Sequence, residues 1–88
     1  MEIIYSEEAQ QDILYWKKSG NRVIQKKIQQ LLIAIAENPF EGIGKPEALK
    51  HNLSGLWSRR ISQEHRIIYL PLNNGTIRVY SLKGHYTS

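Results

Sequence analysis

The stretch from Ser58 to Arg66, SRRISQEHR, brings three arginines and a histidine together within a short distance along the chain. Its pattern predicts a strand, a tight turn and a returning strand. If the turn consists of residues 62–64, Arg60 faces Arg66, and side chains opposite each other share one face of a sheet. Two facing guanidinium groups repel, and a bound phosphate would relieve that repulsion. A shorter turn would instead place Arg66 opposite Ile61.

Other groups suited to phosphate chemistry lie elsewhere in the chain. Glu47 and Lys50 belong to an irregular segment, and His85 and Tyr86 stand near the C-terminus. An acid, a histidine, a cluster of cations and a phenol form a usable set for acid–base chemistry on a phosphate, provided that they meet in space. The alternative is a solvated strand face, which is the usual setting for arginines in a basic protein.

Composition limits the classes of protein that this chain can belong to. The 88 residues predict one domain, 1–88, and the absence of cysteine excludes disulfides and thiolate metal sites. The histidines lack ligand spacing, so we expect no metal and no cofactor. The N-terminus resembles no signal peptide and no apolar run could span a bilayer, so we expect a cytoplasmic protein without a membrane partner. The net charge of +4 allows a polyanionic partner.

The N-terminal half has the pattern of a short strand followed by two helices. Residues 3–5 predict the strand, and Ser6 can cap a helix whose apolar positions follow at helical spacing. Residues 19–21 break that helix, and Asn21 can cap a second one with a clear apolar face. Asn38 and the proline after it end the second helix. The two helices are expected to form an αα-hairpin.

The C-terminal half has the pattern of strands. Residues 40–55 are irregular, although Pro46 could start one helical turn that continues to Lys50. Apolar strand patterns flank the turn at 62–64, and Asn74-Gly75 predicts a hairpin. Pro71 should mark a bulge or an edge. The order is β-α-α-β-β-β, an α+β fold with the helices on one face of a small, mostly antiparallel sheet.

Longer stretches carry a family resemblance. The run GKPEALKHNLSGLWSRRISQEHRIIY, residues 44–69, and the late HY closely resemble the YoeB toxins of the RelE/YoeB group. These are the toxin halves of type II toxin–antitoxin modules. The similarity includes YSEEAQQDILYW near the start and NPFEGIGKPE in the middle, and it extends over nearly the whole chain. It implies a RelE-like fold for the single domain.

The resemblance also implies an activity. Toxins of this group enter the A site of the translating ribosome, cut messenger RNA there without a metal, and so inhibit translation. The 2′-hydroxyl of the message attacks the adjacent phosphate, leaving a cyclic phosphate and a free 5′-hydroxyl. Matched to this family, Glu47 in KPEALK would be the general base, His85 in GHY the general acid, and Arg66 in EHR the group that holds the developing charge.

The same matching gives supporting roles to further residues. Lys50 and Arg60 would assist Arg66 electrostatically, and we count Arg59 with them as a phosphate-binding residue. Tyr86 would stack on the substrate or orient it. The remaining histidines, at positions 51 and 65, are expected to be structural or solvated.

The chain departs from the family pattern at its C-terminus. Thr87 and Ser88 follow the tyrosine, and Gly84 stands where an aromatic residue often precedes the histidine. Neither change removes a catalytic group.

The resemblance implies partners as well as an activity. We expect a YefM-type antitoxin, the ribosome and its message, and a homodimer. Two alternatives stay open. A binding module of the same fold would block translation without cutting RNA. A related toxin would poison a topoisomerase, although such toxins lack this set of acid, arginine and histidine.

Overall fold

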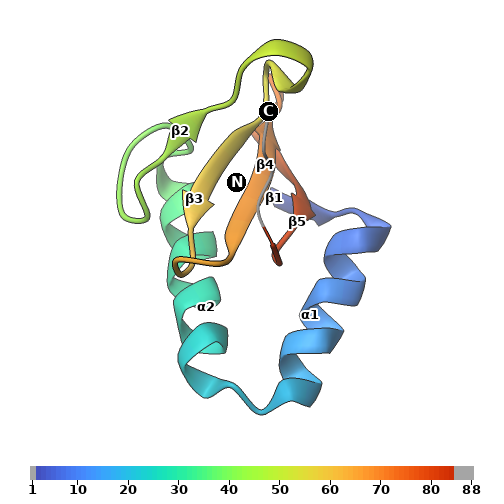
Figure 1. Ribbon diagram of the computed structural model, residues 1–88. Helices are drawn as coiled ribbons and strands as arrows, with labels where there is room; N and C mark the ends of the chain where they lie inside the picture. The colour runs from blue at the N-terminus through green and yellow to red at the C-terminus, as the bar shows by residue number, and fades with distance from the viewer. Residues whose placement is uncertain (1, 85–88) are drawn as a thin grey trace.

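The computed structural model describes residues 2–84 and shows two helices packed on one face of a five-stranded sheet (Figure 1). The last four residues and Met1 lie outside the described part, so the expectations for His85 and Tyr86 cannot be compared with it. In chain order the elements are β1 (Glu2–Tyr5), α1 (Glu7–Ser19), α2 (Arg22–Glu37), β2 (Glu47–Ala48), the 3₁₀ turn η1 (His51–Leu53), β3 (Trp57–Arg60), β4 (Arg66–Pro71) and β5 (Thr76–Ser81).

Both helices begin where the sequence predicts. The Ser6 hydroxyl accepts a hydrogen bond from the Ala9 N–H at 3.0 Å, and the Asn21 side chain accepts one from the Ile24 N–H at 3.1 Å. These bonds satisfy backbone donors that a helix start leaves open. Gly20 ends α1 with a left-handed φ of 72°, a conformation that favours glycine. In Figure 1 the helices meet at this connection and diverge from it toward the strands.

The sheet has the order β1-β5-β4-β3-β2. Only β1 runs parallel to its neighbour β5, and every other pair is antiparallel, which confirms the mostly antiparallel α+β fold. The core lies between the inner face of β4 and β5 and the apolar stripes of both helices. Its fully buried members include Leu31 and Ile35 from α2 and Ile67 and Val79 from the sheet. Within residues 2–84, no helix has the length and apolar character needed to cross a membrane.

Two local expectations were wrong. Residues 47–48 form the short strand β2 instead of a helical turn, because they pair with the neighbouring strand β3. Tertiary pairing here outweighs the local preference set by Pro46. Pro71 marks neither a bulge nor an edge strand. It is the last residue of the central strand β4, and the register shift lies between Ile68 and Tyr69.

Candidate active site

The two arginines of the predicted hairpin face each other in the structure. Arg60 on β3 pairs with Arg66 on β4, which confirms the register set by a turn at 62–64. The Ile61 N–H donates to the His65 carbonyl at 2.9 Å and closes that turn. The alternative pairing of Arg66 with Ile61 is thereby excluded. Two guanidinium groups consequently share one face of the sheet.

That face is the one turned away from the helices. Ile67 and Tyr69 on β4 point into the core, so their alternate neighbour Arg66 points outward. Glu47 on β2 pairs with Ser58 on β3, and side chains paired in this way lie on the same face. Since Ser58 and Arg60 are two residues apart on β3, the sheet presents the acid and both arginines on one side, which we call the open face.

Ser58 is a member of this face that we did not single out from the sequence. Its side chain is 1% exposed, and its hydroxyl oxygen accepts a hydrogen bond from Arg66 Nη1 at 3.4 Å. It therefore lies between Glu47 on one neighbouring strand and Arg66 on the other, and helps to orient the guanidinium group. The period-two alternation of β3 was the signal that could have found it, since that alternation places Ser58 beside Arg60.

Arg59 corrects one expectation about the site. It is fully buried, and its guanidinium group points to the helix-covered side of β3. Nε donates to the Tyr69 hydroxyl at 3.1 Å, and the terminal nitrogens donate to the Ile43 carbonyl at 3.2 Å, the Glu41 carbonyl at 3.0 Å and the Asn38 carbonyl. Arg59 is thus occupied by the protein's own oxygen atoms. It cannot serve as the phosphate-binding residue that we expected.

The buried arginine has a structural effect on the loop that leads to Glu47. Its bonds tie residues 38–43 to the sheet, and the Tyr69 hydroxyl adds a hydrogen bond to the Pro39 carbonyl at 2.6 Å. Burial raises the pKa of the Tyr69 phenol, while the hydrogen bond and charge of Arg59 act in the opposite direction. The phenol therefore keeps the proton that it donates to Pro39.

Gly44 continues the attachment of this loop. Its carbonyl accepts a hydrogen bond from the Arg60 N–H at 2.6 Å, and its φ is 85°. A Cβ at this position would approach Leu31 Cδ2 to 2.6 Å, so only glycine lets the backbone pass here without a shift. The loop is consequently fixed to β3 three residues before Glu47.

The structure does not join Lys50 to the arginine pair. Lys50 directly precedes η1 and is exposed, and no contact joins it to Glu47, Arg60 or Arg66 in the described part of the chain. Arg60 itself lines a hollow with Lys27 and Lys45, so further positive charge lies beside Arg60. No ion pair connects Glu47 to either arginine within residues 2–84. The cations of the open face are therefore available to an external anion.

The C-terminal segment reaches the same site. The Arg66 N–H donates to the Gly84 carbonyl at 2.8 Å, and the Gly84 N–H donates to His65 Nδ1 at 2.9 Å. Gly84 has a left-handed φ of 73°, which suits glycine at this departure from the family pattern. The described chain thus ends beside Arg66. His85 and Tyr86, the next residues in the sequence, lie outside the described residues.

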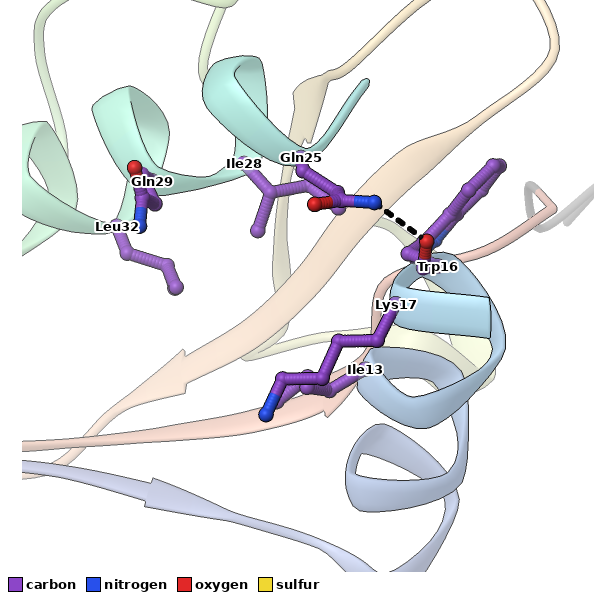
Figure 2. A pocket seen from close by; sticks show the side chains of 7 residues that line it. All are labelled: Ile13, Trp16, Lys17, Gln25, Ile28, Gln29 and Leu32. Atoms are coloured by element: carbon purple, nitrogen blue, oxygen red, sulfur yellow. Dashed lines mark hydrogen bonds between the residues drawn. The ribbon is translucent and has the colours of Figure 1, made fainter. Parts of the chain in front are cut away.

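A second hollow lies elsewhere in the molecule, between the two helices. Figure 2 shows its lining, in which Ile13 and Trp16 come from α1 and Ile28 and Leu32 from α2. This lining is mainly apolar and contains none of the expected site residues. In residues 2–84, no three metal-binding side chains of the His, Cys, Asp and Glu types gather in one place.

Comparison with known proteins shows the family of this chain. A family model described as the YoeB-like toxin of bacterial type II toxin–antitoxin systems matches residues 5–86. Toxin YoeB of Escherichia coli K12 is 46% identical over 86 residues, covering 98% of this chain and all of that protein.

Solved structures are similar over the same length. A YoeB–YefM complex from Staphylococcus aureus has 44% identity and a TM-score of 0.85, and a YoeB dimer from that organism has 42% identity and a TM-score of 0.86. Each alignment covers 98% of both chains. The matched residues include both sides of the arginine hairpin and the loop that carries Glu47. This chain therefore belongs to the YoeB-like toxins of bacterial type II toxin–antitoxin systems.

Proposed function

We propose that this toxin is an endoribonuclease, an mRNA interferase that cuts the message in the A site of the ribosome without a metal and thereby stops translation. The observation that carries the proposal is the arrangement on the open face. Glu47, Arg60 and Arg66 come from three neighbouring strands and share one side of the sheet. A carboxylate can act as a general base toward an RNA hydroxyl, and two opposed guanidinium groups can stabilise the negative charge of a phosphodiester.

The proposed reaction is an internal transfer on the RNA. The 2′-hydroxyl oxygen forms a bond to the adjacent phosphorus, and the bond from phosphorus to the 5′ oxygen of the next nucleotide breaks. Glu47 takes the proton of the 2′-hydroxyl, and His85 gives a proton to the leaving oxygen. The products are a 2′,3′-cyclic phosphate and a 5′-hydroxyl, so no water and no metal is consumed in this step.

Arg66 has the central electrostatic role in this proposal. Negative charge develops on the phosphate oxygens as the new bond forms, and a preorganised guanidinium group stabilises it. Ser58 restricts the direction of that group through the bond at 3.4 Å. Arg60, opposite Arg66, and the exposed Lys50 add positive potential. Tyr86 would orient the substrate.

The proposal includes partners that the chain would meet in the cytoplasm. The Staphylococcus aureus relatives form a YoeB–YefM complex and a YoeB dimer. We propose a YefM-type antitoxin for this chain, with an acidic or disordered segment that covers the basic open face and folds on binding. We also propose a homodimer. If co-expression of the YefM-type partner left growth inhibition unchanged, the proposed pairing would be wrong.

The test of the nuclease is primer extension on a defined message in a cell-free translation reaction. Wild-type protein, Arg66→Gln and His85→Ala are compared, each with and without ribosomes. Arg78→Gln is the matched control, because Arg78 is an exposed arginine on β5 of the same sheet and loses the same charge. We expect cuts at fixed codon positions with wild type and Arg78→Gln, only when ribosomes are present.

The same cell-free reaction distinguishes the nuclease from a protein that blocks translation without cutting RNA. Translation that stops while the message stays whole would identify a binding inhibitor that never cuts RNA. Cuts of equal strength with Arg66→Gln and wild type would remove Arg66 from the proposed site. Cuts in the absence of ribosomes would contradict the ribosome dependence while leaving the nuclease chemistry in place.

A further inference from the structure

Three side chains form hydrogen bonds to the backbone of the segment after β5. The Leu82 N–H donates to Asp12 Oδ2 at 2.9 Å, and the Leu82 carbonyl accepts from Trp16 Nε1 at 2.9 Å. The Gly84 N–H donates to His65 Nδ1 at 2.9 Å. Asp12, Trp16 and His65, which we call the C-terminal clamp, therefore fix both ends of the segment 82–84.

The members of the clamp on α1 are buried and held from behind. Asp12 and Trp16 are 8% and 6% exposed and lie one helical turn apart, on the same side of α1. Burying a carboxylate or an indole N–H costs free energy unless it is hydrogen-bonded, and the backbone of Leu82 supplies both partners. Figure 2 shows that Gln25 of α2 donates to the Trp16 carbonyl, at 2.7 Å, which holds this turn of α1.

His65 joins the clamp to the arginine site. Its ring packs edge-on against Trp16 with centroids 4.8 Å apart, and Glu64 Oε2 lies 4.0 Å from Nε2. In the contact with Gly84, Nδ1 is the acceptor and the backbone N–H is the donor. The next residue, Arg66, donates its own N–H to the Gly84 carbonyl at 2.8 Å. The N–H and the carbonyl of Gly84 are thus hydrogen-bonded to two consecutive residues, His65 and Arg66.

We propose that Asp12, Trp16 and His65 are positioning residues that fix the backbone at Gly84, which in turn is hydrogen-bonded to Arg66. This inference rests on the proposed function, in which Arg66 stabilises the charge that develops on the phosphate. The geometric reason is that Gly84 is hydrogen-bonded to both His65 and Arg66, so a shift of the segment 82–84 would disturb the strand end that carries Arg66. A misplacement of about 1 Å in a reacting group can cost on the order of 10²-fold in rate.

The experiment compares His65→Leu with His65→Asn in single-turnover cleavage of ribosome-bound message. Asparagine keeps an acceptor oxygen near the position of Nδ1, whereas leucine has none. We expect the rate of the cleavage step to fall about 10-fold or more with His65→Leu, while the concentration for half-maximal rate stays the same. His65→Asn should recover most of the loss. His51→Leu, which removes an exposed histidine in η1, is the matched control.

A second measurement reports on the clamp without any activity. Hydrogen exchange of the Gly84 amide, followed by NMR, should be slow in wild type and His65→Asn and faster in His65→Leu. If His65→Leu does not fold, Trp16→Phe serves instead, because it deletes only the bond from Nε1 to the Leu82 carbonyl while keeping an aromatic ring. For this variant the exchange is followed at the amides of residues 82 and 84.

The outcomes distinguish a failure of the proposed clamp from a failure of the proposed nuclease function. Wild-type cleavage by folded His65→Leu would overturn the inference, and so would a loss that His65→Asn fails to restore. A Gly84 amide that exchanges equally fast in all variants would also overturn it. A wild-type protein that cuts no message contradicts the proposed function instead, and the exchange rates then decide alone whether the clamp holds Gly84.

Discussion

Arg59 and Arg60 are consecutive residues of the same strand, yet they end in opposite environments. Arg59 is fully buried, and its guanidinium group is bonded to three backbone carbonyls and the Tyr69 hydroxyl. Arg60 is partly exposed and faces Arg66 on the open face. The alternation of β3 alone sends them to different sides of the sheet. Two residues of identical chemistry thus belong to a structural network and to a candidate active site.

The difference between the two faces lies in how their charges are satisfied. On the buried side, an Arg59 N–H group without a hydrogen-bond partner would cost free energy. The carbonyls of the loop 38–43 supply these partners. No buried side-chain nitrogen or oxygen atom in the described part of the chain is left without a hydrogen-bond partner. On the open side, two cations face each other, and no acid among residues 2–84 forms an ion pair with them. One face stabilises the fold, and the other keeps its charge available to an anion.

The largest effect on stability is expected from Arg59→Met. Loss of the guanidinium group leaves buried carbonyls of the loop without donors, which should lower the free energy of unfolding by about 3–5 kcal/mol, on the order found for broken buried charge networks. Urea denaturation measures this change. Arg60→Met is the matched control and should change the free energy of unfolding by less than about 1 kcal/mol. If Arg59→Met and Arg60→Met lowered the free energy of unfolding by similar amounts, the stabilising role would not be confined to the buried arginine.

Arg66→Gln should have the converse effect, large on activity and small on stability. Cleavage of ribosome-bound message should slow by about 10²–10³-fold, because a donor aimed at developing charge is lost. The free energy of unfolding should shift by less than about 1 kcal/mol, since the side chain is partly exposed and makes one long hydrogen bond to Ser58. Arg78→Gln should leave both quantities near wild type. A large decrease in the free energy of unfolding of Arg66→Gln would mean that Arg66 stabilises the fold, as Arg59 does.

Tyr69→Phe tests the buried network without removing its charge. The variant loses the bonds to Arg59 Nε and the Pro39 carbonyl, which should cost about 1–3 kcal/mol at neutral pH. Because burial raises the pKa of Tyr69, the unfolded state releases this proton first as the pH rises above about 10. The free energy of unfolding of wild type therefore falls in that range.

The alkaline fall should be smaller in Tyr69→Phe than in wild type. It should not vanish, because burial also raises the pKa of Tyr5. Thermal or urea unfolding between pH 7 and pH 11 measures the slope. Equal slopes in both proteins would contradict the protonated, bonded state of Tyr69.

Arg60→Gln should produce the smallest change, with a sign opposite to that of Arg59→Met. Removing one of two opposed cations should raise the free energy of unfolding by about 0.2–1 kcal/mol in low salt. Replacing chloride by sulfate at equal ionic strength should stabilise wild type more than the variant, because we expect the divalent anion to bind between the two guanidinium groups. An Arg60→Gln protein that is less stable than wild type in chloride would show that the pair does not repel.

The local pattern of the sequence determined much of this protein. Ser6 and Asn21 start the helices, and Asn74-Gly75 turns the last hairpin. The spacing around residues 62–64 left two pairings for Arg66, and the structure confirms the one with Arg60. Each of these features depends on residues close together in the chain, where backbone geometry allows few solutions. The long stretches that resemble the YoeB toxins also indicated the family.

The tertiary structure decided the rest. The pattern did not predict β2, because residues 47–48 become a strand only when they pair with β3. It did not reveal that Arg59 is buried, because its bonds reach back to carbonyls of a loop without regular structure.

The C-terminal clamp was equally absent from the pattern. Asp12 and Trp16 are 70 and 66 residues from Leu82 in sequence, and only the packing of α1 beside the end of β5 brings them together. Contacts of this range depend on the whole core having formed. The types and local spacing of residues determined where the helices start and where the chain turns. The side to which each charge points, and the groups that it contacts there, followed from the packing of the sheet against its helices, because that packing decides which face is buried.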